Sequence, residues 1–176
     1  MIEKGVWIAA VLVAAIAGWM DWRYRRIPNW LTVPALLVGI LGNTLASGWS
    51  GAKASLLGAG LGLALLLPFV LMRSLGAGDW KLVGALGAFL RPEPLITVLI
   101  GAILVAGIMA AGLIVYKRRV RQALRNVGRI LAGLFSLRLL GPDLSLDNPE
   151  SLRIPFGVAV SLTVVFYGVR RALGGL

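Results

Sequence analysis

The sequence contains no cysteine and no histidine, and only seven of its 176 residues are acidic. Without cysteine there is no disulfide framework, no thiol nucleophile and no cysteine zinc site. Without histidine there is no Ser-His or Cys-His catalytic pair and no imidazole metal ligand. Acid–base chemistry in this chain therefore depends on seven carboxylates, and we expect neither a metal nor a cofactor.

Apolar residues dominate what is present, at 59% of the chain together with 23 glycines. A soluble monomer could not bury so much apolar surface, so the solvent for most of this chain is lipid. Six runs approach the length of about 20 residues that spans a bilayer: Gly5–Met20, Trp30–Ser47, Ala54–Met72, Leu82–Leu90, Leu95–Tyr116 and Ile154–Ala172. The fourth run is short, so it either crosses a thinned bilayer or is a buried half-helix; we count it as a span. The prediction is an all-α integral membrane protein with about six transmembrane helices in a single polytopic domain, residues 1–176.

The net charge of +11 would suggest nucleic acid as the partner of a soluble protein. In a membrane protein, excess lysine and arginine mark the cytoplasmic loops instead. If the N-terminus is outside and the chain crosses six times, thirteen of the 18 basic residues lie on the inner side. We therefore predict a multi-pass protein of the cytoplasmic (inner) membrane, without a nucleic-acid partner. Asp21 and the basic run after it replace a signal-peptide cleavage site, so the first helix is expected to be retained.

The segment Lys117–Arg138 differs from the apolar runs. Its apolar residues follow helical spacing and its arginines occupy another face, which predicts one cytoplasmic amphipathic helix on an anionic inner leaflet. A helix that binds nucleic acid or a protein partner is the alternative. The polar segment Gly141–Arg153 is predicted to be a loop.

Two of the seven acids stand out by position. The others lie at the N-terminus or in loops beside prolines: Glu3, Glu93, Asp143, Asp147 and Glu150. Asp21 ends the first apolar run and Asp79 precedes the fourth, so both are expected at the inner membrane boundary. Asp79 could be only a helix N-cap. Asp21 could be an interfacial charge paired with Arg23 or Arg25, although the dipole at a helix C-terminus disfavours an anion.

Together, the two acids suggest a mechanism. Two carboxyls within a few ångströms share one proton and titrate as a unit. The ionised member can take a proton from water as that water attacks a peptide carbonyl, while the protonated member polarises the carbonyl.

Two motifs carry a family resemblance. Residues 76–82, Gly-Ala-Gly-Asp-Trp-Lys-Leu, resemble the GxGDxKL signature of the type IV prepilin peptidases, which are membrane aspartic proteases. Residues 21–29 resemble the family's other motif, an aspartate followed by a basic stretch and Ile-Pro-Asn. Residues 154–157, Ile-Pro-Phe-Gly, resemble the start of its last span.

The resemblance implies roles for individual residues. Asp21 and Asp79 match the catalytic pair, and Gly76 and Gly78 match glycines that let the backbone bend beside the active aspartate. Lys81 matches the motif lysine, which either acts on Asp79 or meets lipid headgroups. Pro28 and Asn29 match the Ile-Pro-Asn turn, although Asn29 could be only the N-cap of the second helix.

The chain lacks the cysteine-rich insertion of larger members, so it resembles the compact subfamily linked to tight-adherence (Flp-type) pili. We do not predict N-methyltransferase activity. The resemblance implies an aspartic endopeptidase that cuts the short leader from a prepilin with a hydrophobic N-terminal helix, at the cytoplasmic face. A small proton-coupled transporter and a non-enzymatic pilus-assembly scaffold are the alternatives. The sequence does not determine the oligomeric state.

Overall fold

The computed structural model describes residues 2–72, 75–116 and 155–174. These residues form α1 (Ile2–Tyr24), α2 (Asn29–Leu71), α3 (Ala77–Leu90), α4 (Pro92–Tyr116) and α6 (Phe156–Ala172). The described residues include no strand, which confirms the all-α prediction for them. Lys117–Arg138 and Gly141–Arg153 lie outside the described residues.

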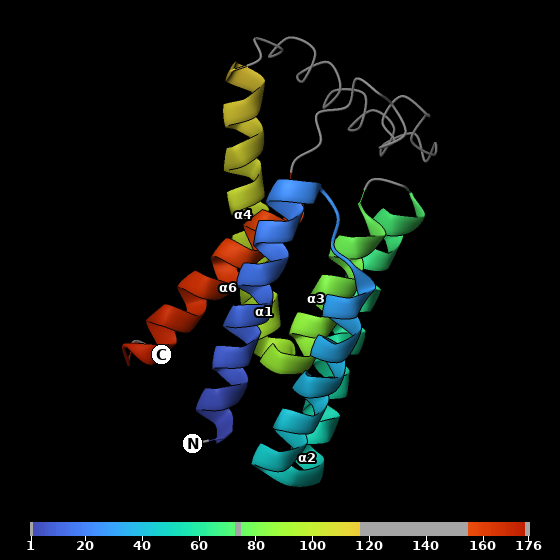
Figure 1. Ribbon diagram of the computed structural model, residues 1–176, viewed down its shortest axis with the longest axis vertical. Helices are drawn as coiled ribbons and strands as arrows, with labels where there is room; N and C mark the ends of the chain where they lie inside the picture. Colours follow the sequence, from blue (N-terminus) through green and yellow to red (C-terminus); the bar gives the residue numbers. More distant parts are fainter. Residues whose placement is uncertain (1, 73–74, 117–154, 175–176) are drawn as a thin grey trace.

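The helix α2 is a hairpin of two helical legs. Its backbone leaves helical geometry at Ser47 and Gly48, where Gly48 has φ 60°, a left-handed value that favours glycine. The chain reverses there, so legs 29–46 and 49–71 run side by side (Figure 1). A Cβ on Gly51 would overlap the carbonyl oxygen of Asn43, which shows how closely the legs approach. The legs correspond to two separate runs in the sequence.

By length and composition, α1, α2 and α4 are apolar enough to cross a membrane. Many of their large apolar side chains face outward, among them Ile8, Leu41 and Ile103, each 61–62% exposed. Such surfaces suit lipid contact. A membrane protein is therefore supported, whereas the number of six crossings stays a prediction.

The helix α3 lies at the centre of the bundle (Figure 1). Every residue from Leu82 to Leu90 is buried, as expected for a helix that is apolar on all sides. Its 14 residues extend only about 21 Å, less than the roughly 30 Å hydrocarbon core. Both of its ends therefore need polar partners close to membrane depth.

The two ends of the bundle differ, and we name them by their residues. At the aspartate end, α1 ends and α3 and α6 begin. At the arginine end, α1 begins, α3 ends before Arg91 and α6 ends (Figure 1). Asp21 and Asp79 both belong to the aspartate end.

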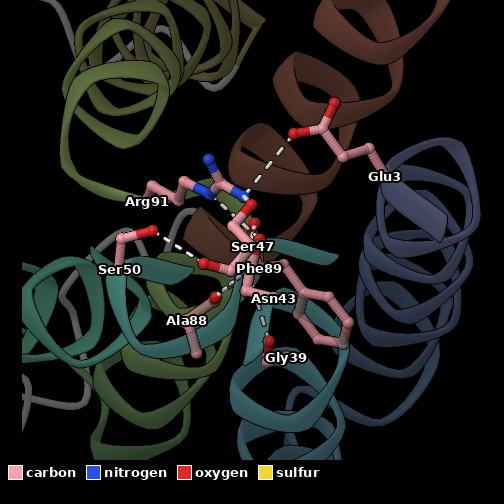
Figure 2. A network of polar contacts seen from close by, with 8 residues as sticks. All are labelled: Glu3, Gly39, Asn43, Ser47, Ser50, Ala88, Phe89 and Arg91. Atoms are coloured by element: carbon pink, nitrogen blue, oxygen red, sulfur yellow. Dashed lines mark hydrogen bonds and ion pairs between the residues drawn. The ribbon is translucent and has the colours of Figure 1, made fainter. Parts of the chain in front are cut away.

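At the arginine end, Asn43 holds the last turn of α3. Its side-chain amide donates to the carbonyl oxygens of Ala88 at 2.8 Å and Phe89 at 3.1 Å (Figure 2). The Ser55 hydroxyl also donates to the Ala88 carbonyl. Carbonyls at a helix C-terminus have no partner within the helix, so these contacts satisfy groups that lipid could not.

Arg91 completes this network. It ends α3 in a left-handed conformation, φ 67°, with its backbone N–H donating to Gly87. Its Nε donates to Asn43 Oδ1 at 2.9 Å and its Nη2 to Ser47 Oγ at 3.1 Å; Glu3 Oε1 lies 3.6 Å from Nη2 (Figure 2). One guanidinium thus joins α1, α2 and α3.

Candidate active site

Asp21 lies in the last turn of α1 and is buried, with 7% of its surface exposed. Its Oδ2 accepts a hydrogen bond from the Val158 backbone N–H at 3.2 Å. A helix C-terminus disfavours an anion, and a helix N-terminus favours one. The first turn of α6 therefore offsets the cost of placing this carboxyl at the end of α1.

Arg25 fixes the end of α1. It has φ 53°, a left-handed value, and its backbone N–H donates to the Asp21 carbonyl at 3.0 Å, as in a left-handed helix cap. The Arg25 charge attracts the Asp21 carboxyl. Arg23 turns elsewhere, with its guanidinium 5.7 Å from the centre of the Tyr24 ring. Of the two expected partners of Asp21, Arg25 is thus the one that interacts.

Asp79 is the third residue of α3 and is not its N-cap. The N-cap is Gly76, whose backbone is extended (φ −69°, ψ 140°), and no side chain caps this helix. The N-cap interpretation of Asp79 is therefore wrong, because the helix begins earlier than expected. The Oδ1 atom of Asp79 is buried and has no hydrogen-bond partner among the described residues. Such an atom is uncommon in folded proteins and needs an explanation.

The two carboxyls come together at the first turn of α6. Asp21 and Asp79 lie close enough to interact electrostatically, and the Gly157 backbone N–H approaches both. A Cβ on Gly157 would stand 2.9 Å from Asp21 Oδ2, so any larger residue here would displace the Asp21 carboxyl or the start of α6. Three helices that are far apart in the sequence therefore build one acidic site beside backbone N–H donors.

The motif glycines act through their lack of a side chain. Neither Gly76 nor Gly78 has a positive φ. A Cβ on Gly76 would lie 3.2 Å from Asp79 Oδ2, and one on Gly78 would lie 3.2 Å from Ile27. Ile27 is buried, and its Cδ1 also lies 2.9 Å from the position of a Gly157 Cβ. Ile27 thus packs between the start of α3, which carries Asp79, and the first turn of α6, which contacts Asp21.

Lys81 and Asn29 meet each other. Lys81 Nζ donates to Asn29 Oδ1 at 2.9 Å, which joins the start of α2 to the first turns of α3. Pro28, with an extended backbone (φ −78°, ψ 152°), is the N-cap of α2, so the N-cap interpretation of Asn29 is wrong. The structure thus brings the two sequence motifs into contact.

Sequence reasoning did not assign Ile27 and Gly157 to the site. Both stand in the quoted motifs, Ile-Pro-Asn and Ile-Pro-Phe-Gly, which was the available signal. Among the residues that the structure describes, no three acidic side chains gather as metal ligands. The chemical groups on hand are two carboxyls and the N–H groups of α6.

We compared the chain with known protein families, curated proteins and solved structures. The family model of the type IV leader peptidase family matches residues 8–111, a stretch that holds both aspartates. A prepilin leader peptidase/N-methyltransferase of Xanthomonas campestris pv. campestris is 33% identical over 112 residues, 57% of this chain and 38% of that protein. The chain thus spans about two fifths of this curated relative. No solved structure matches.

Proposed function

The chain belongs to the type IV leader peptidase family, and from this membership we propose that it is a membrane aspartic endopeptidase whose catalytic groups are Asp21 and Asp79. The substrate we propose is a type IV prepilin of the Flp kind, cut at the cytoplasmic membrane face. The family makes a prepilin-processing peptidase the expected activity; the aspartate pair and the Flp substrate are our additions.

The meeting of Asp21 and Asp79 at the start of α6 is the observation that carries this proposal. Glu3 and Glu93 also lie in first turns of apolar helices, but they are exposed, whereas Asp21 is buried and Asp79 has a buried oxygen; Asp21 and Asp79 interact with each other across α1 and α3. Asp79 also keeps a buried oxygen without a donor among the described residues. A water molecule or a substrate amide can supply the missing hydrogen bond.

The proposed reaction uses one shared proton. The ionised carboxyl accepts a proton from water while the water oxygen bonds to the peptide carbonyl carbon, and the protonated carboxyl hydrogen-bonds to the carbonyl oxygen. The tetrahedral intermediate collapses as the carbon–nitrogen bond breaks and the leaving amine takes a proton from the pair. Water is consumed, and the dyad returns to its starting state.

The bundle also suggests how substrate reaches the site. A prepilin's hydrophobic helix would lie in the bilayer beside the enzyme, which brings the leader junction to the depth of the aspartates. α1 begins and α6 ends at the arginine end (Figure 1), which supports an even number of crossings. With the aspartate end at the cytoplasm, the N-terminus is outside, and the basic cytoplasmic residues face anionic lipid. We propose that residues 1–176 form one such domain.

Co-expression with a leader-bearing Flp-type prepilin tests the proposal. Intact-mass measurement of the pilin should show loss of the leader, and the shift should vanish with Asp21→Asn or with Asp79→Asn. Asp143→Asn makes the same chemical change at an acid that the sequence places in a loop, so it should still cleave.

The same experiment separates the alternatives. A scaffold or a proton-coupled transporter would leave the pilin uncut in every variant. Cleavage by the Asp21→Asn/Asp79→Asn double variant would eliminate the aspartate mechanism while leaving the family assignment intact.

A further inference from the structure

A cleft of about 420 Å³ opens at the arginine end, far from the aspartates. Its walls come from α1, α2, α6 and the junction between α3 and α4. Four charged side chains line it: Glu3, Arg91, Glu93 and Arg171. Apolar side chains such as Val6, Trp7 and Leu90 form much of the rest.

The four charges are engaged to different degrees. Arg91 and Glu3 belong to the network that holds α3. Arg171 lies over the ring of Trp7, 5.0 Å from its centre. Neither Arg171 nor the exposed Glu93 forms an ion pair among the described residues. One cation and one anion therefore face the cleft without being neutralised by each other.

The depth of the cleft indicates the kind of ligand. It lies where α1 and α4 begin and α6 ends, which is the level of the membrane surface when the apolar helices α1 and α4 cross the bilayer. Trp7 stacks on Tyr167 with the ring centres 5.4 Å apart, and Lys53 lies over Trp49 at this same end. Aromatic and basic residues at helix ends are typical of the headgroup region. Molecules at this depth that carry both charges and apolar chains are phospholipids.

We propose that this cleft binds the headgroup of a phospholipid with a primary amine, the phosphoethanolamine type. Its phosphate would pair with Arg171, its ammonium with Glu93, and its acyl chains would follow the apolar helix faces beside Trp7. Two acids and two bases suit a zwitterion, because an anionic headgroup would leave Glu93 without a partner. A choline headgroup has no N–H to donate to a carboxylate. The proposal is independent of the peptidase function.

Lipid retention by the purified full chain tests this site. Native mass spectrometry from detergent, with matched acyl chains, would compare phosphatidylethanolamine, phosphatidylglycerol and phosphatidylcholine. We expect the wild type to retain phosphatidylethanolamine about tenfold more strongly than the other two, as for the one charge-assisted hydrogen bond between its ammonium and Glu93.

Neighbouring arginines give a matched pair of variants. Arg171→Gln should weaken the retention of all three phospholipids, because the phosphate that Arg171 would pair with is common to them. Arg170→Gln removes the same charge from the neighbouring residue, whose side chain does not line the cleft, and should leave retention unchanged. Glu93→Gln should retain phospholipid but no longer discriminate ethanolamine from choline. This variant keeps the proposal testable even if Arg171→Gln fails to fold.

Three results would overturn the site. The first is equal retention of the three lipids by the wild type, and the second is a preference for phosphatidylglycerol. The third is an equal loss in Arg170→Gln and Arg171→Gln, which would show that surface charge alone attracts the lipid.

Discussion

Both ends of α3 have polar groups inside an apolar bundle, but the two ends differ in whether these groups have hydrogen-bond partners. At the arginine end, the Asn43 amide donates to Ala88 and Phe89, and its oxygen accepts from Arg91. At the aspartate end, Asp79 Oδ1 is buried with no partner among the described residues. Paired groups hold helices together, whereas an unpaired group remains available for water or substrate.

The two ends also differ in the free-energy cost of their buried polar atoms. A buried polar atom without a partner costs about 1–3 kcal/mol. The two such side-chain atoms among the described residues, Asp79 Oδ1 and Thr32 Oγ1, lie in the first turns of α3 and α2, both at the aspartate end. Isosteric changes at the aspartate end should therefore abolish activity with little loss of stability. Changes at the arginine end should lower stability and affect activity less.

The largest effect is expected from the aspartates. Asp21→Asn and Asp79→Asn should each lower the rate of prepilin cleavage by about 10³-fold or more, because proton transfer at the dyad is lost. If they act as one unit, the double variant should be no slower than the slower single variant. Cleavage rates in reconstituted bilayers would measure this, with unfolding by denaturing detergent as the stability control. If the rate losses of the two single variants multiplied in the double variant, the two aspartates would have independent roles, which would contradict a dyad.

Gly157→Ala should have the next largest effect. The new Cβ would stand 2.9 Å from both Asp21 Oδ2 and Ile27 Cδ1, so either the Asp21 carboxyl or the start of α6 must shift, and both shifts change how the two meet. A displacement of about 1 Å at an active site can cost about 10²-fold in rate. Gly107→Ala is the control, because its Cβ would meet nothing within 4 Å. Equal rates in the two variants would mean that α6 does not position the pair.

Asn43→Ala tests the arginine end. It removes three hydrogen bonds between different parts of the bundle, to Ala88, Phe89 and Arg91. At about 0.6 kcal/mol each, as found between membrane helices, the loss of stability is about 2 kcal/mol. The neighbouring Thr44→Ala is the control, since the Thr44 hydroxyl bonds only Ile40 of its own helix turn, at 2.7 Å. A loss of stability no greater than in Thr44→Ala would show that the network does not hold α3.

The sequence predicted the helices because long apolar runs carry their own signal, and polar residues near Ser47 separated the two legs of α2. It selected Asp21 and Asp79 as the candidate pair because so few acids were available and both stood in motifs; that they are catalytic stays a prediction. It did not predict that the first turn of α6 would pack on Asp21, since a contact such as that of Val158 with Asp21, over 137 positions, leaves no local pattern. The N-cap errors at Asn29 and Asp79 arose because extended residues before them, Pro28 and Gly76, begin the helices.

The smallest effect is expected from Lys81. Its hydrogen bond to Asn29 is exposed, and exposed polar contacts contribute little, so Lys81→Met should lower the cleavage rate at most about fivefold. Asn29→Ala removes the same contact from the other side and should match it, and the double variant should be no worse than either. If Lys81 instead acted on Asp79 directly, Lys81→Met would change the pH profile of cleavage and Asn29→Ala would not. The motif lysine would then belong with the reacting carboxyls, not with the contacts that hold the helices in place.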